Sequence, residues 1–100
     1  SSMKIFISQP MSNRTNEQIL NERNSIVYKI DKQLNTPFEI IDSFFDDVYH
    51  NENPLFYLGK SIELMSQADL VYFARGWEQS RGCNIEHECA KRYGLVRYYE

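Results

Sequence analysis

Residues 68–94 read ADLVYFARGWEQSRGCNIEHECAKRYG and place a strand, a polar loop and a helix in direct succession. Leu70–Phe73 is a short apolar run of the kind that forms a buried strand. A polar, glycine-containing loop follows it and leads into a short helical segment. Gly94 supplies a helix stop, because glycine readily adopts the left-handed conformation that often ends helices. The segment therefore predicts one β-loop-α unit.

The rest of the chain continues this alternation of apolar strands and amphipathic helices. Further strands are expected at Lys4–Ser8, Phe38–Ile41 and Leu95–Tyr99, and further helices from a capping box at Thr15 to Leu34 and over Leu55–Met65. Strict alternation of strand and helix predicts an α/β fold, with a parallel sheet covered by helices on both faces. We find no linker and no internal repeat, so one domain over residues 1–100 is expected.

One residue of the third helix needs a special explanation. At about 100° per residue, Ile85, Cys89, Ala90 and Tyr93 form one apolar arc, and Glu86 falls near its middle. Burying a carboxylate is costly unless it has a partner or a function. A plain alternative is a glutamate near a helix N-terminus that is stabilised by the helix dipole. If Glu86 is functional, it can serve as a nucleophile or as a general base.

The expected topology also predicts where a ligand binds. In open parallel sheets, ligands bind beyond the carboxyl ends of the strands, where the strand order switches. Three loops converge there, namely Ser8–Asn13, Asp42–Asp47 and Arg75–Gly82. Their candidate ligand-binding residues are Gln9, Pro10 and Met11 for phosphate or sugar hydroxyls, Asp42 for sugar hydroxyls or a metal, and Trp77 for stacking on a base. The alternatives are a tight turn with capping polar residues after the first strand, and a Trp77 that only covers the end of the sheet.

Composition excludes several other classes of function. A net charge of −3 gives no basic field for a DNA or RNA polymer, and no apolar run is long enough to cross a membrane. Cys83, His87 and Cys89 lack a fourth ligand and a common face, so no metal is expected. The glycine fingerprints of dinucleotide and Walker loops are missing, and no cofactor is expected. Reduced cysteines and the lack of a signal-peptide pattern predict a cytoplasmic protein.

The segment from Ala68 to Gly94, together with KIFISQPMS near the start, resembles the nucleoside 2-deoxyribosyltransferase-like superfamily. The pattern Gly-Trp-Glu-x-Ser-x-Gly-x-x-x-Glu is similar to that of a small uncharacterised branch found in bacteria and their phages. This resemblance implies a flavodoxin-like or Rossmann-like three-layer sandwich with a small parallel sheet of about four strands. It also implies a nucleoside or nucleotide as the small-molecule ligand.

The resemblance further implies roles for single residues. Gly82, Glu86, Ala90 and Gly94 are in register with the pattern of the characterised relatives, whose glutamate attacks the anomeric carbon of the sugar. Ser80 takes the position that contacts the sugar or its phosphate, Gly82 belongs to the same loop, and Ser8 to Met11 line the substrate site. Two residues depart from the pattern: Ser61 replaces an aspartate, and Glu88 replaces a glycine.

The expected activity is therefore cleavage or transfer of an N-glycosidic bond through Glu86. Its main alternative is a nucleotide-binding module of the same fold without turnover, and a purely structural oligomer subunit is a third. We also expect a homodimer or a higher homo-oligomer, because the last strand has no following helix and several aromatics need burial. The segment Phe44–Tyr57 is the expected contact.

Overall fold

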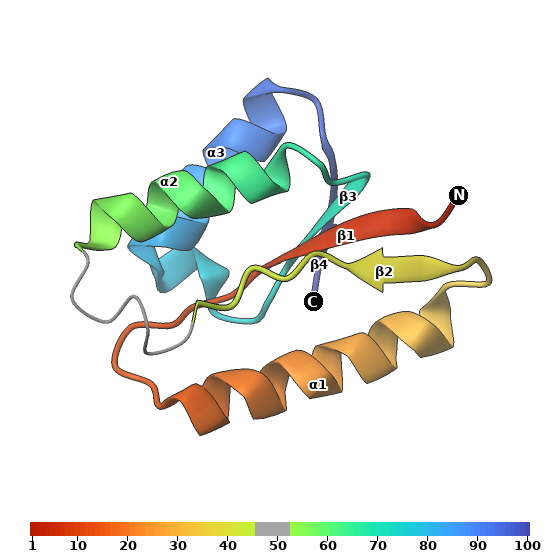
Figure 1. The fold of residues 1–100 in the computed structure, drawn as a ribbon, viewed down its shortest axis with the longest axis horizontal. Helices are drawn as coiled ribbons and strands as arrows, with labels where there is room; N and C mark the ends of the chain where they lie inside the picture. Colours follow the sequence, from red (N-terminus) through yellow and green to blue (C-terminus); the bar gives the residue numbers. More distant parts are fainter. Residues whose placement is uncertain (46–52) are drawn as a thin grey trace.

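Four parallel strands form the centre of the molecule, and three α-helices cover them (Figure 1). The structure is a computed structural model, and it describes residues 1–45 and 53–100. Its elements, in chain order, are β1 (Met3–Ser8), α1 (Asn16–Gln33), β2 (Phe38–Ile40), α2 (Pro54–Met65), β3 (Leu70–Phe73), the short 3-10 turn η2 (Trp77–Gln79), α3 (Arg81–Arg92) and β4 (Val96–Tyr99).

The sheet has the strand order β2-β1-β3-β4, and every neighbouring pair is parallel. Helix α1 lies on one face of the sheet, and α2 and α3 lie on the other (Figure 1). The predicted α/β class and its flavodoxin-like three-layer arrangement are thereby confirmed. At the carboxyl edge, Ser8 pairs in register with Phe73, and Phe73 pairs with Tyr99. The next two strands along the chain, β2 and β3, lie on opposite sides of β1, so the loop after β1 lies at the switch in strand order.

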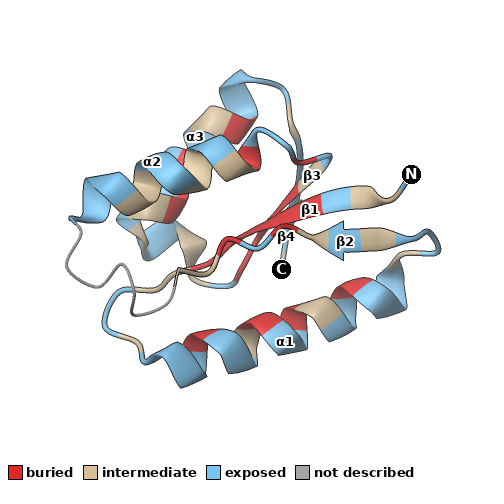
Figure 2. Cartoon of the chain, in the orientation of Figure 1, coloured by how far each residue is buried: buried red, intermediate tan, exposed pale blue. Residues whose placement is uncertain are grey.

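Alternating side chains of the strands divide the core into two layers. Ile5, Ile7 and Tyr72 pack against the face of α1 that carries Ile26 and Ile30. The side chains of the opposite face pack against α2 and α3, and these are Phe6, Val71 and Phe73 with Met65 and Ala90. Figure 2 shows the buried residues of α1 on its sheet-facing side. This two-sided burial explains why β1 and β3 read as continuous apolar runs.

Local signals fix the helix boundaries close to where the sequence places them. The predicted capping box at Thr15 is present, with reciprocal bonds between Thr15 and Gln18. Helix α2 starts at Pro54, one residue before the predicted start, because the Asn53 side chain caps the amide of Phe56. None of the helices in the described part of the chain has both the length and the apolar character needed to span a bilayer.

Helix α3 corrects one expectation. Its buried residues are Cys83, Glu86 and Ala90, whereas Ile85 is 39% and Tyr93 is 83% exposed. Two members of the predicted apolar arc are therefore exposed, while Ala90 and Glu86, which lies near the middle of the arc, are buried. Tyr93 is the C-cap and follows the last helical turn, where Gly94 has a φ of 69° and ends the helix. Because Tyr93 lies outside the helix proper, the helical periodicity of 100° per residue does not predict the direction of its side chain.

Candidate active site

A cavity of about 940 Å³ opens at the carboxyl edge of the sheet, beside the end of β1. One wall comes from the loop after β1 and the start of α1, and the opposite wall comes from residues 80–86 of α3. Residues 43–45 and residues of α2 complete the lining and include apolar side chains such as Phe44, Leu55 and Leu58. Glu86 belongs to this lining, so the buried carboxylate lies where the topology predicts a ligand.

The Glu86 carboxylate is held by a serine hydroxyl. Ser8 at the end of β1 donates a hydrogen bond of 2.6 Å to Oε1 of Glu86, and the Ser61 hydroxyl on α2 lines the same cavity and favours the ionised carboxylate. Glu86 is only 8% exposed, and burial raises its pKa to about 7, although both hydroxyls and the charge of Arg23 oppose this shift. The salt bridges formed by the described residues do not include Glu86. About half of the Glu86 side chains are therefore ionised near neutral pH.

This raised pKa predicts that the protein loses stability as the pH rises from about 4.5 to 7. The carboxyl group has a pKa of 4.5 in an unperturbed chain and about 7 in the folded protein. In that window the folded state binds more protons, so the free energy of unfolding falls as the pH rises, by about 2–3 kcal/mol in total.

Urea unfolding at about pH 5 and about pH 8 measures this loss. Glu86→Gln is the matched control, since the neutral amide keeps the size of the side chain and an acceptor for Ser8. We expect the variant to be the more stable protein at the higher pH and to lack this pH-dependent component. Equal pH dependence in the two proteins would contradict the prediction.

Cys83 is the other potential nucleophile beside the carboxylate. Its side chain is 2% exposed, and burial raises the pKa of its thiol. The thiol is therefore protonated at neutral pH and is a poor nucleophile. Cys83 and Cys89 are both free thiols. Glu86 is consequently the better candidate for covalent chemistry at this cavity.

The structure gathers most of the predicted ligand-binding residues around Glu86. Gln9, Met11, Ser80 and Gly82 line the cavity, and Ser8 contacts the carboxylate directly. Ser80 is also the N-cap of α3, with its Oγ accepting a bond of 3.3 Å from the Cys83 amide. These residues come from both ends of the chain, and the parallel sheet places them together.

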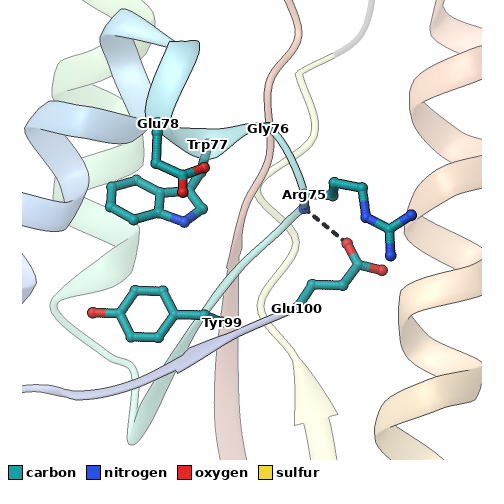
Figure 3. Close-up of a pocket in the computed structure, with 6 residues that line it drawn as sticks. All are labelled: Arg75, Gly76, Trp77, Glu78, Tyr99 and Glu100. Atoms are coloured by element: carbon teal, nitrogen blue, oxygen red, sulfur yellow. Dashed lines mark hydrogen bonds between the residues drawn. The ribbon is translucent and has the colours of Figure 1, made fainter.

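Three predicted residues lie elsewhere. Pro10 and Asp42 are not part of the cavity lining, and Asp42 is exposed while the next residue, Ser43, is buried and faces the cavity. Trp77 packs on His87 with ring centroids 4.4 Å apart. It lines a separate, open hollow of about 460 Å³ with Arg75 and Tyr99 (Figure 3). A base that binds beside Glu86 therefore does not stack on Trp77 in this arrangement.

Several residues of the site were not predicted from the sequence. Arg14 and Arg81 line the cavity, and Ser43 accepts a hydrogen bond of 3.2 Å from the buried Arg23. Ser61 was noted only as a replacement for an aspartate, yet it lines the same cavity as Glu86. A buried position for Arg23 was detectable, because it lies on the apolar stripe of α1 between Ile19 and Ile26.

The described residues contain no group of three histidine, cysteine, aspartate or glutamate side chains that is arranged to hold a metal ion. Asp46 and Asp47, which belong to the second predicted loop, lie outside the described residues. The cavity is thus lined by hydroxyl, amide, guanidinium and apolar groups around one carboxylate. Such a lining suits a polar organic ligand held mainly by hydrogen bonds.

Comparison with known protein families gives one match. Residues 3–99 match the family described as "Domain of unknown function (DUF4406)". A search of curated proteins found no significant match. Since the family match covers nearly the whole chain, the protein belongs to the DUF4406 family.

Proposed function

We propose that this protein cleaves or transfers the N-glycosidic bond of a nucleoside or nucleoside monophosphate, with Glu86 as the nucleophile. The observation that carries the proposal is a buried carboxylate in a cavity wall, bonded to the Ser8 hydroxyl and outside any described salt bridge. The resemblance to the nucleoside 2-deoxyribosyltransferase-like superfamily assigns the same residue to the same role.

In the proposed first step, an ionised oxygen of Glu86 attacks the anomeric carbon of the sugar. A carbon–oxygen ester bond forms as the carbon–nitrogen bond breaks, and the bonding electron pair leaves with the base, which takes a proton from water. Water then attacks the same carbon, which releases the sugar and regenerates the carboxylate. If a second base attacks in place of water, the result is transfer.

The hydroxyl of Ser8 suits this sequence of steps. Its hydrogen bond of 2.6 Å fixes the orientation of Oε1 and stabilises the carboxylate that must be present before the attack and after release. Burial acts in the opposite direction and keeps the carboxylate weakly solvated, which favours attack on carbon. Glu86 is therefore both oriented and reactive near neutral pH.

The charges of the lining favour a monophosphate over an uncharged nucleoside. Arg14 and Arg81 both line the cavity; Arg14 pairs with Glu22 at 2.7 Å, and Arg81 opens α3 next to the Ser80 hydroxyl. Arginine side chains and helix N-termini are common phosphate-binding groups. The apolar side of α2, with Leu55 and Leu58, offers a surface for a flat base.

A non-catalytic nucleotide-binding module is the second candidate. Ser61 favours it, because the related enzymes carry an aspartate there. Thermal-shift screening with nucleosides and nucleoside monophosphates, followed by chromatography for free base, separates the candidates. Stabilisation with base release supports the enzyme, and stabilisation without release supports binding alone. No response to any ligand would reject both and favour a structural subunit.

We also propose that the protein forms a homodimer or a higher homo-oligomer. All four residues of β4 are exposed, including Val96 at 60%, and Leu55 at the start of α2 is 74% exposed. An uncovered edge strand with apolar side chains favours association. Part of the expected contact, Phe44–Tyr57, lies outside the described residues. Light scattering at micromolar concentration is expected to give at least twice the chain mass of 11.9 kDa, and a monomer mass would contradict this.

We also propose a reducing, cytoplasmic location for the protein. The two free thiols support this proposal.

A further inference from the structure

Gln9 is a buried side chain of the cavity lining whose amide nitrogen is fully used. It follows β1 directly and is 5% exposed. Its Nε2 donates a hydrogen bond of 2.9 Å to the carbonyl of Ile19 and another of 2.8 Å to Oε1 of Glu22, both on α1. A carboxamide nitrogen carries two hydrogens, so the side chain has no donor left for a ligand.

The oxygen of the same amide is unused. No described residue donates a hydrogen bond to Oε1 of Gln9, although most buried polar atoms in proteins are paired. Because the carboxamide is planar, Oε1 points away from the two acceptors that hold Nε2. The reversed amide is unfavourable, since it would place Oε1 against the Ile19 carbonyl and the Glu22 carboxylate, which both only accept. Gln9 therefore presents an acceptor in one fixed orientation.

Glu22 strengthens this arrangement from outside the cavity. The same Oε1 atom that accepts from Gln9 also accepts a bond of 2.7 Å from Nη1 of Arg14, and this nitrogen donates to the Pro10 carbonyl at 3.0 Å. Hydrogen bonds to an ionised carboxylate are stronger than those between neutral groups. Glu22 itself does not belong to the described lining, so a ligand in the cavity leaves the bond to Gln9 in place.

We infer that Gln9 is a specificity-determining residue, whose Oε1 accepts a hydrogen bond from a donor group of the ligand. In a nucleotide, the matching donors are an amino group of the base and a hydroxyl group of the sugar. Base carbonyls and phosphate oxygens only accept and do not fit, and a ring N–H of a base lies beside carbonyl oxygens that would repel Oε1. That the ligand is a nucleotide rests on the proposed function, whereas the acceptor character of Gln9 does not.

The test is a double-mutant cycle between Gln9 and single donor groups of the ligand, measured by calorimetric titration. For the base, guanosine monophosphate is compared with inosine monophosphate, and adenosine and cytidine monophosphates are compared with their analogues that lack the amino group. For the sugar, each ribonucleotide is compared with its 2′-deoxy and 3′-deoxy forms. In the wild type, loss of the donor that Oε1 binds should weaken binding about tenfold.

Gln9→Met keeps the approximate size of the side chain and removes the acceptor. In this variant, loss of the same donor should weaken binding less than about twofold. Gln9→Leu is a second variant without an acceptor, for the case that Gln9→Met does not fold. A wild-type ratio below about twofold for every pair would overturn the inference without any variant, and so would an unchanged ratio in the variants or a lack of binding to every nucleotide.

Gln79→Met is the matched control. It makes the same replacement on η2, where Gln79 is exposed and outside the described lining of the cavity. We expect it to keep the wild-type ratio for every pair of ligands. If it reduces the ratio as much as Gln9→Met does, the assignment to Gln9 is wrong. Coupling to an amino group would place Gln9 beside the base, and coupling to a hydroxyl would place it beside the sugar.

The binding cycle and the assay of base release can fail separately. If binding couples to Gln9 and no base is released, the acceptor role stands and the proposed reaction is rejected. If base is released and no donor group couples to Gln9, the reaction stands and the acceptor role is rejected.

Discussion

Glu86→Ala is expected to lower the rate of base release by at least about 1,000-fold and to leave a folded protein. The substitution removes the only carboxylate in the described lining of the cavity, so no described side chain there could form the glycosyl ester in its place. It also removes a buried group whose ionisation is unfavourable, so the fold should tolerate it. Chromatography of free base after incubation with a nucleoside monophosphate measures the rate, and circular dichroism checks the fold.

Glu88→Ala is the matched control for this experiment. Glu88 lies two residues further along α3, is exposed, and pairs with Arg92 on the outer side of the helix. Its removal should change the rate of base release less than about twofold and should leave the stability nearly unchanged, because exposed ion pairs contribute little. Wild-type rates in Glu86→Ala would reject the proposed chemistry, and a large loss in Glu88→Ala would show that the assay responds to general damage of α3.

Phe73→Ala is expected to have the largest effect on stability, a loss of about 3–5 kcal/mol in the free energy of unfolding. Phe73 ends β3 and is fully buried at 0% exposure. Its ring contacts those of Trp77, His87 and Tyr99 at centroid distances of 5.4, 5.0 and 5.5 Å. Truncation would leave a cavity among three aromatic side chains on different elements, which cannot all move inward to fill it.

Urea unfolding followed by fluorescence measures this loss, since Trp77 is the only tryptophan of the chain and contacts Phe73. Tyr93→Ala provides the comparison, because Tyr93 is 83% exposed and its removal should cost less than about 0.5 kcal/mol. If Phe73→Ala costs less than about 1 kcal/mol, the aromatic cluster does not contribute to stability as described. The free energy of unfolding of such a domain is only about 5–15 kcal/mol, so partial unfolding of the variant is also an expected result.

The fold could be predicted because its signals are local and repeated. Each of the first three strands is followed by a helix with its own start or stop signal, such as the capping box at Thr15 or the glycine at position 94. Alternation of this kind permits few topologies, and a parallel sheet follows from handed crossovers. The start of α2 differed by one residue, because the Asn53 side-chain cap decides the first turn, and one boundary of β1, of β2 and of β4 also differed by one residue.

The site could be predicted only in part, and the reason is geometric. Glu86 and the loop after β1 were found because their places follow from sequence order in a parallel sheet. Ser61 was not assigned to the site, because its place in the cavity lining depends on how α2 is rotated about its axis. Trp77 lies against Tyr99 at the end of β4 and not beside Glu86, since Gly76, with a φ of 86°, sets the direction in which η2 continues. No pattern in the sequence fixes that direction.

The burial of Glu86 affects both the stability of the protein and the proposed reaction. A carboxyl group that is largely removed from water lowers the free energy of unfolding at neutral pH, and a leucine or methionine at this position would remove that destabilisation. Directed evolution that rewards only survival at high temperature should therefore select against this glutamate early. Its retention in such an experiment would require a second selection that rewards the reaction itself.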